Sequence, residues 1–332
     1  MKVVITGGAG FLGKKLAARL LADGQLTGPS GKLELIEELV LFDTALSPIG
    51  AGDGRVLTVA GDIADAKQVE ALIGDHTASV FHLAAVVSAG AEADFDLGYS
   101  VNLDGTRNVL EACRRLEQPA RLVFTSSIAA YGGDLPEVVT DTTMLTPQTS
   151  YGTQKAMGEL LVNDYTRKGY LDGRALRLPT ITVRTGRPNK AASTWASSII
   201  REPLSGVDAI CPVRPDNAMA CLSPRRVIEA LVRAHELPGE AFGFSRALLL
   251  SGISITAAEM EAAMRRHAGN RKIGQVVWEP DAGTQKIVDG WPRASKSARA
   301  EKLGFTVDQS IDEIVQAFIA DDLDDQIKSI TA

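Results

Sequence analysis

Two periodicities alternate along the first half of the chain. Short runs that are apolar throughout, such as Leu39-Val40-Leu41-Phe42, are typical of strands in a sheet covered on both faces. The stretches between them repeat their apolar residues at helical spacing. Strands are predicted over Lys2–Ile5, Glu38–Phe42, Val56–Ala60, Ser79–His82, Leu122–Thr125 and 174–178, and helices over Phe11–Ala22, 65–73, 100–117 and 150–168. Strands that alternate with helices predict an α/β fold with a doubly wound parallel sheet.

The alternation of strand and helix periodicities becomes less regular after residue 180, where prolines and glycines cluster. Shorter helices are predicted at 193–202, 224–236, 256–268 and 309–323, with strands at 247–250 and 274–278. No linker-like run separates the two halves. We therefore predict a first domain over 1–180, with later returns near 218–252, and a smaller C-terminal lobe packed on it, mainly 181–330.

The composition narrows the class of protein. Of 332 residues, 45% are hydrophobic and 23% are charged, and a net charge of −6 without a basic run argues against nucleic-acid binding. No apolar run reaches ~18 residues, so no membrane span is predicted. The three cysteines are too few for a disulfide framework, and the four histidines lack the spacing of metal ligands. We expect a cytoplasmic protein with buried free thiols and no metal site.

A glycine-rich turn follows the first predicted strand. Gly7, Gly10 and Gly13 are spaced G-x-x-G-x-x-G and lead directly into a helix. Such glycines allow a sharp turn, let a pyrophosphate approach the backbone N–H groups at the helix start, and let helix and strand pack closely. The context of strand, turn and helix predicts a dinucleotide site.

An acidic residue at the end of the second predicted strand bears on the choice of dinucleotide. Asp43 can accept hydrogen bonds from both hydroxyls of the adenosine ribose and would repel a 2′-phosphate, which favours NAD over NADP. Its distance from Gly13 exceeds the usual ~20 residues, and we attribute the excess to a surface insertion at Gln25–Lys32. Asp62 and Ile63 follow the third strand and could contact the adenine. Alternatively, Asp62 is the N-cap of the next helix.

Candidate acid–base chemistry lies at the start of the predicted helix 150–168. Tyr151 and Lys155 are four residues apart, so both side chains lie on one helix face. A phenol ordinarily titrates near pH ~10, and a neighbouring ammonium favours its phenolate form. Ser127, at the C-terminal end of the fifth strand, lies where open α/β sheets bind ligands and could orient the reacting oxygen.

These motifs together resemble the extended short-chain dehydrogenase/reductase family, which includes nucleotide-sugar epimerases and dehydratases. The resemblance is strong over about 1–180 and rests on the glycine-rich turn, Asp62-Ile63, Phe81–Ala85, Thr125–Ser127 with Tyr131-Gly132, and Tyr151 with Lys155. It implies a Rossmann domain with NAD as cofactor, Tyr151 as the acid/base, Lys155 as its partner and ribose ligand, and Ser127 as the hydroxyl partner. Further cofactor contacts are expected at Phe11, Leu12, Leu83, Ala84, Ala85, Asn102, Leu178, Pro179 and Thr180. His82 is expected to be structural, and a homodimer through the two helices that flank the fifth strand is expected.

The second half departs from the nucleotide-sugar members of that family. Thr180 stands where they usually carry asparagine, and 219–226 lacks their acidic segment. A basic stretch, 183–193, follows the sixth strand instead and suits a small carboxylate, because a guanidinium can hold it with two parallel hydrogen bonds. Residues 187–193, together with 200–204, resemble a branch of the family that oxidises the 2-hydroxyl of D-erythronate, giving 2-dehydro-D-erythronate, with NAD.

The substrate contacts expected on this basis are Ser88, Ser127, Arg184, Asn189 and Ser193, with Arg184 as the carboxylate anchor. Two other functions remain open at this point. One is a nucleotide-sugar epimerase or dehydratase that retains its NAD, and the other is a non-catalytic NAD-binding protein.

Overall fold

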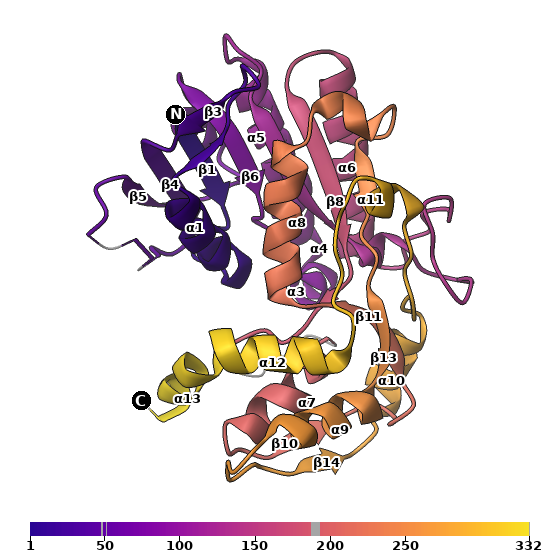
Figure 1. The fold of residues 1–332 in the computed structure, drawn as a ribbon. Coiled ribbons are helices and arrows are strands. Elements are labelled where there is room, and N and C mark those ends of the chain that lie inside the picture. The colour runs from indigo at the N-terminus through magenta and orange to yellow at the C-terminus, as the bar shows by residue number, and fades with distance from the viewer. Residues whose placement is uncertain (48, 51, 187–192, 332) are drawn as a thin grey trace. The chain divides into compact units, whose positions relative to one another are not determined.

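The computed structural model describes residues 1–47, 49–50, 52–186 and 193–331, which form two compact units (Figure 1). The first unit comprises Met1–Ala130, Pro147–Arg177 and Ile228–Leu248. The second comprises Tyr131–Thr146, Leu178–Val227 and Leu249–Ala332. Residues 131–146 therefore belong to the second unit although they lie between two segments of the first. Residues 228–248 belong to the first unit although they lie between two segments of the second.

A seven-stranded parallel sheet forms the centre of the first unit, as predicted. Its strand order is β12-β8-β7-β6-β1-β4-β5. The strands are β1 (Lys2–Thr6), β4 (Glu38–Asp43), β5 (Val56–Ala60), β6 (Thr77–His82), β7 (Arg121–Ser127), β8 (Asp172–Leu178) and β12 (Ala247–Leu249). Val4 aligns with Val40 on one side and with Val80 on the other. The order reverses at β1, so the ends of β1, β4 and β6 meet where doubly wound sheets bind nucleotides.

Helices cover both faces of this sheet. The elements are α1 (Phe11–Asp23), α2 (Ala66–Leu72), α3 (Ser88–Ala93), α4 (Phe95–Gly98), α5 (Gly105–Arg114), α6 (Ser150–Arg167), α8 (Pro224–Glu236), and the short 3₁₀ turns η2 (Ile128–Ala130) and η3 (Gly239–Phe242). Apolar residues of α2, α5 and α6 share one core with the sheet, and Figure 1 shows α1 and α8 over the other face.

One predicted helix has a different form. Instead of a single α-helix over 100–117, a π-helical segment, η1 (Tyr99–Asp104), precedes α5. A π-helical turn carries one extra residue and redirects the side chains within it. The altered register brings Asn102 into the interior, where it is 2% exposed.

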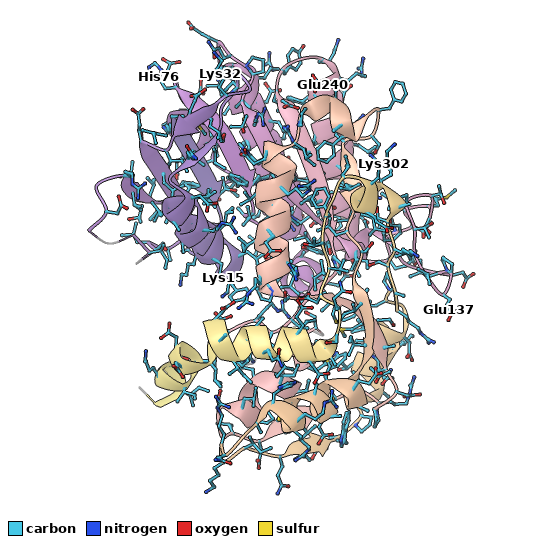
Figure 2. All side chains as sticks on the ribbon, viewed as in Figure 1. Lys15, Lys32, His76, Glu137, Glu240 and Lys302 are labelled. Carbon is cyan, nitrogen blue, oxygen red and sulfur yellow. The ribbon has the colours of Figure 1, made fainter. Side chains whose placement is uncertain are left out.

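The expected surface insertion at 25–32 is more ordered than predicted. It forms an antiparallel hairpin of β2 (Gln25–Thr27) and β3 (Leu33–Leu35), and Lys32, labelled in Figure 2, lies just before β3. The Thr27 backbone N–H donates to the Glu236 carboxylate at 3.0 Å, and the Thr27 hydroxyl donates to the same group. The insertion is therefore tied to the C-terminal end of α8.

The second unit has its own apolar core. Its strands are β9 (Thr180–Ile181), β10 (Ala209–Cys211), β11 (Ala218–Leu222), β13 (Ile253–Thr256) and β14 (Val276–Trp278), and its further helices are α7 (Trp195–Leu204), α9 (Ala257–His267), α10 (Ala282–Asp289), α11 (Ala298–Lys302), α12 (Ile311–Asp321) and α13 (Leu323–Thr331). Residues of α7, α9, α12 and α13 pack into one cluster. The elements β9, β10, β11, β13, α10, α11 and α13 were not predicted; most of them are short, and several lie beside prolines or glycines.

None of the helices in the described part of the chain is long and apolar enough to span a membrane.

The three cysteines, Cys113, Cys211 and Cys221, are buried and free, as expected. Burial raises the pKa of the Cys113 thiol to about 12 and that of Cys211 to about 11, so these thiols are poor nucleophiles at neutral pH.

Candidate active site

The glycine-rich turn packs directly against its neighbours. A Cβ on Gly13 would lie 2.1 Å from the Gly7 oxygen, and one on Gly7 would lie 2.8 Å from the Ala84 nitrogen. Gly7 also has a φ of +74°, which side chains disfavour. These glycines therefore bring the turn into contact with the segment after β6.

The turn leads into a helix whose start is open to an anion. Gly10 is the N-cap of α1, and as a glycine it has no side chain to cap this helix. No acidic residue lies in the first turn, which begins with Phe11 and Leu12. Backbone N–H groups at a helix N-terminus attract phosphates through hydrogen bonds and the helix dipole.

The carboxylate at the end of β4 is held in a fixed orientation. One oxygen of Asp43 accepts a hydrogen bond from the Ala9 backbone N–H at 3.0 Å, and the other accepts from Thr44 N–H at 2.7 Å. The first contact joins Asp43 to the glycine-rich turn itself. Each carboxylate oxygen retains acceptor capacity for a further donor.

The alternative role considered for Asp62 is wrong. The N-cap of α2 is Asp65, whose side chain accepts from the Lys67 and Gln68 backbone N–H groups. Asp62 is exposed, and its carboxylate accepts a hydrogen bond from Ala64 N–H at 2.9 Å. Ile63 is 5% exposed and packs in the core.

The start of α6 brings Tyr151 and Lys155 to the end of β7. The Thr149 hydroxyl caps this helix by accepting from Gly152 N–H. A Cβ on Gly152 would lie 2.0 Å from the Ala129 oxygen, so only glycine lets α6 approach η2 this closely. Ser127 ends β7, and its hydroxyl oxygen accepts from Ala129 N–H at 3.1 Å, which leaves the hydroxyl proton available to donate.

Lys155 is buried among aromatic rings. Its Nζ donates to the Thr125 carbonyl at 2.8 Å and lies 4.7 Å from the Phe124 ring centre and 5.6 Å from that of Tyr151. Burial lowers the pKa of Lys155 to about 7, although the negative charge of Glu159 opposes this shift. Near neutral pH the ammonium of Lys155 is therefore in equilibrium with the neutral amine, and it lies next to a phenol in a weakly solvated site.

Glu159 is a part of this arrangement that the sequence reasoning missed. It lies one turn beyond Lys155 and is 3% exposed. Arg177 Nε donates one bifurcated hydrogen bond to both oxygens of the Glu159 carboxylate, at 2.8 and 2.9 Å. The carboxylate also accepts from Arg177 Nη2 at 2.6 Å and from the Ser126 hydroxyl at 2.5 Å. The sequence did offer one signal for Glu159, namely an acidic residue four positions after a lysine on the same predicted helix.

A second missed residue, Gln154, lies between Tyr151 and Lys155 in sequence. Its carbonyl accepts a hydrogen bond from Asn102 Nδ2 at 2.7 Å. Asn102 in turn accepts from Val86 N–H at 2.8 Å and donates to the Val86 carbonyl at 2.9 Å. Asn102 thus holds the segment that carries Leu83, Ala84 and Ala85, with Ser88 just beyond it at the start of α3.

His82 is structural, as expected. Its ring nitrogens hydrogen-bond to the Thr6 hydroxyl at 2.7 Å and to the Thr106 hydroxyl at 2.9 Å. Burial lowers its pKa to about 3, so the ring is neutral at physiological pH. It links β1, β6 and α5 beneath the candidate site.

In the second unit, two of the predicted substrate residues meet. Arg184 Nη2 donates to the Ser193 carbonyl at 3.2 Å and to its hydroxyl at 3.1 Å. Asn189 lies outside the described residues. Leu178 ends β8, Pro179 follows it, and Thr180 begins β9, which pairs with β11.

Similarity to known proteins shows the family of this chain. The model of the "NAD dependent epimerase/dehydratase family" matches residues 3–233. The chain belongs to this family. It is 53% identical to a D-erythronate dehydrogenase of Cupriavidus necator, covering 97% of this chain and 98% of that protein. It is 42% identical to a D-erythronate dehydrogenase of Haemophilus influenzae, covering 97% of this chain and 100% of that protein.

A solved structure agrees with the fold. The structure described as the nucleoside-diphosphate-sugar epimerase from Agrobacterium tumefaciens superposes with a TM-score of 0.90 at 40% identity, covering 98% of this chain and 96% of that one. This member of the epimerase/dehydratase family is thus an NAD-dependent dehydrogenase with a Rossmann-like fold.

The residues at the sheet's switch point fit NAD. The backbone around Gly7 and Gly13 leaves no room for side chains, Gly10 at the start of α1 has no side chain to cap the helix, and Asp43 is oriented by two backbone N–H groups. These features suit a pyrophosphate and a ribose with free hydroxyls.

We expect replacement of Asp43 by asparagine to reduce the preference for NAD over NADP by about tenfold or more, because a charge-assisted acceptor for the ribose is lost together with its repulsion of a 2′-phosphate. The ratio of kcat/KM for the two cofactors measures this. Asp23→Asn, at the end of α1 and paired with Arg19, is the matched control and should leave the ratio unchanged. A wild-type protein that prefers NADP would show that Asp43 has another role.

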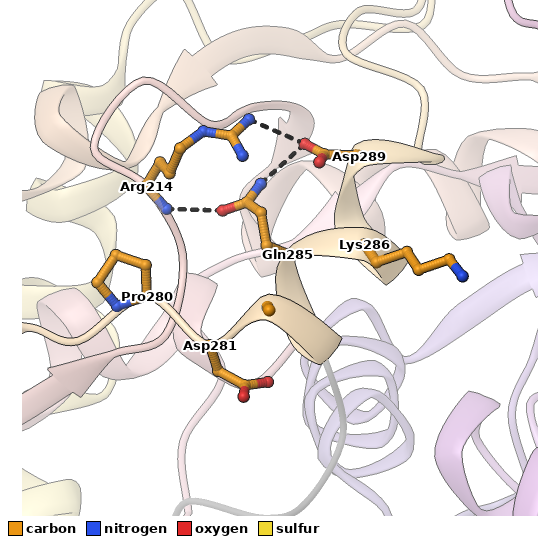
Figure 3. A pocket seen from close by; sticks show the side chains of 7 residues that line it. Arg214, Pro280, Asp281, Gln285, Lys286 and Asp289 are labelled. Carbon is orange, nitrogen blue, oxygen red and sulfur yellow. Dashed lines mark hydrogen bonds and ion pairs between the residues drawn. The ribbon is translucent and has the colours of Figure 1, made fainter.

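The second unit also contains a pocket of about 450 Å³, lined by Arg214, Pro280, Asp281, Ala282, Gln285, Lys286 and Asp289 (Figure 3). Its polar groups largely pair with one another. Arg214 donates to Asp289 at 3.1 Å, and Gln285 bonds both Arg214 N–H and Asp289 at 2.8 Å. None of the predicted site residues that the structure describes lines it.

Proposed function

We propose that this enzyme oxidises the 2-hydroxyl of a small sugar acid, D-erythronate, to the corresponding 2-keto acid, and releases NADH after each turnover. The observation that carries the proposal is the end-to-end similarity to two D-erythronate dehydrogenases. The basic stretch that contains Arg184, in place of a nucleotide-sugar signature, supports a small acidic substrate.

Tyr151 is proposed as the general base. Its phenolate oxygen takes the proton of the 2-hydroxyl, and Lys155 stabilises that phenolate as a neighbouring cation fixed by the Thr125 carbonyl. Ser127 donates a hydrogen bond to the reacting oxygen and so fixes its position relative to the phenol. NAD, when bound, supplies the hydride acceptor for the C2 hydrogen.

Cofactor binding is assigned to the predicted residues. Gly7, Gly10, Phe11, Leu12 and Gly13 would hold the pyrophosphate, and Asp43 the adenosine ribose. Asp62 and Ile63 would contact the adenine. Leu83, Ala84, Ala85, Asn102, Tyr151, Lys155, Leu178, Pro179 and Thr180 are proposed for the remainder of the cofactor.

Arg184 is proposed as the carboxylate anchor. Two bonds from Nη2 to Ser193 hold one arm of its guanidinium, and a planar guanidinium matches the shape and charge of a carboxylate. Asn189, Ser193 and Ser88 are proposed as polar contacts to the sugar-acid hydroxyls.

The buried charge of Lys155 should affect stability in a pH-dependent way. Because its pKa in the folded protein, about 7, is below the ordinary 10.5, protonation opposes folding, fully below pH 7 and less as the pH rises towards 10.5. We expect Lys155→Met to raise the free energy of unfolding of the NAD-free protein, on the order of a few kcal/mol below pH 7, while lowering turnover and NAD affinity. Urea unfolding at several pH values measures the first effect.

The matched control is Lys168→Met, an exposed residue that follows α6. It should change neither the stability profile nor the kinetics. An Lys155→Met protein that is less stable than wild type at every pH, or as active, would contradict the assignment.

A nucleotide-sugar epimerase or dehydratase with retained NAD is the second candidate, favoured by the structure described as a nucleoside-diphosphate-sugar epimerase. The two differ in whether NADH accumulates. Incubation with free NAD and four-carbon to six-carbon sugar acids should yield NADH under the proposed function. Conversion of UDP-sugars without net NADH would favour the second candidate.

We further propose a cytoplasmic homodimer through α5 and α6. Leu160 on α6 is 71% exposed, which suits a helix face covered by another copy. Sedimentation equilibrium tests the assembly, and a monomer at all concentrations would exclude it.

A further inference from the structure

The backbone that carries Arg184 is held at both ends by buried side chains. At one end, Arg184 N–H donates to the Ser197 hydroxyl at 3.0 Å, and the Arg184 carbonyl accepts from Arg201 Nη1 at 2.7 Å. Arg201 is 3% exposed, and its guanidinium also pairs with Glu202 at 2.6 Å. This end is therefore fixed to α7.

The other end is held by the C-terminal helix. Gln326 of α13 accepts a hydrogen bond from Gly186 N–H at 2.7 Å, and its Nε2 donates to the Gly186 carbonyl at 3.2 Å. One neutral amide thus satisfies both backbone groups of a residue 140 positions earlier in the chain. Gly186 has a φ of +110°, so this turn also requires glycine.

Gln326 is itself firmly placed. It is 2% exposed, and Leu323, one turn earlier on α13, is 1% exposed. Leu323 belongs to the core cluster that also contains Val183, the residue just before Arg184. The side chain therefore reaches Gly186 from a helix anchored in the core of the same unit.

The position of Arg184 depends on this support. Its guanidinium bonds Ser193, so a change in the backbone from 184 to 186 would turn the guanidinium or break those contacts. Bidentate recognition of a carboxylate is sensitive to such a change, because both N–H groups must be aligned at once.

We propose that Gln326 is a positioning residue for the acidic substrate: through Gly186, the C-terminal helix fixes the backbone that presents Arg184. The inference rests on the proposed role of Arg184. It predicts an effect on the binding of the acid and none on NAD, whose proposed pyrophosphate and ribose contacts lie in the first unit.

The test is Gln326→Met, which keeps the volume and removes both hydrogen bonds. We expect the KM for D-erythronate to rise roughly tenfold, from the loss of two hydrogen bonds, with the KM for NAD unchanged. The Gly186 amide should exchange faster with deuterated water in the protein alone. The control is Lys328→Ala on the same helix, whose exposed side chain pairs with Asp325.

A second variant, Gln326→Asn, retains the amide on a side chain one methylene shorter and serves if the methionine variant does not fold. It should raise the same KM. Faster Gly186 exchange with an unchanged KM for the acid, or an equal rise in both KM values, would overturn the inference. If the wild-type protein does not oxidise sugar acids, the proposed function itself is refuted. That outcome can be told apart from one in which the wild type is active and only the role of Gln326 fails.

Discussion

Replacement of Tyr151 by phenylalanine is expected to lower kcat by ~10²–10⁴-fold, the usual contribution of general acid–base catalysis. The ring remains and still lies beside Lys155, whose Nζ is 5.6 Å from its centre in the structure. Only the oxygen that takes the proton is lost, so NAD affinity should change little. Steady-state rates over a range of pH, with NAD binding followed by titration, measure the two effects separately.

Tyr165→Phe provides the matched control. Tyr165 lies near the other end of α6, and its hydroxyl donates to Glu111 rather than facing the candidate site. This variant should keep near-normal turnover. Near-normal activity of Tyr151→Phe at all pH values would instead remove Tyr151 from the mechanism.

The second large effect is expected at Arg184. Arg184→Ala should raise the KM for the sugar acid about 10–150-fold, because a charge-assisted hydrogen-bonded pair contributes ~1.5–3 kcal/mol. The KM for NAD should change far less. Arg184→Lys should also weaken binding of the acid, since an ammonium cannot reproduce the two parallel bonds of a guanidinium.

Arg225→Ala tests whether the loss of any cation in the second unit has this effect. Arg225 forms an exposed pair with Asp321 at 2.7 Å, and its removal should leave both KM values unchanged. An Arg184→Ala protein with an unaltered KM for the acid would move the anchor elsewhere. Arg201 suits that role poorly, because its guanidinium already bonds Glu202, Ser198 and the Arg184 carbonyl.

Features encoded by neighbouring residues were predicted well from the sequence. β5 has the predicted bounds, Val56–Ala60, and α1 ends one residue beyond its predicted end. The glycine-rich turn and the spacing of Tyr151 and Lys155 are local signals of the same kind. Each depends on a periodicity or on a backbone requirement within a few residues.

The features that were not predicted depend on contacts between residues far apart in the sequence. Glu159 gains its place from Arg177 and Ser126, and Gln154 from Asn102 on the π-helical segment. The hairpin at 25–35 forms by the pairing of β2 with β3, and it is held in place by a hydrogen bond to Glu236, more than 200 positions away. No periodicity signals such contacts, because each arises only when separate elements pack together.

Oxidation at the 2-hydroxyl of a small sugar acid can be followed with D-erythronate that carries deuterium at C2 or at C3. We expect the NADH formed from the C2-labelled acid to carry the deuterium, and that formed from the C3-labelled acid to carry none. Deuterium transferred from C3, or no NADH from either acid while a UDP-sugar is converted, would contradict this expectation.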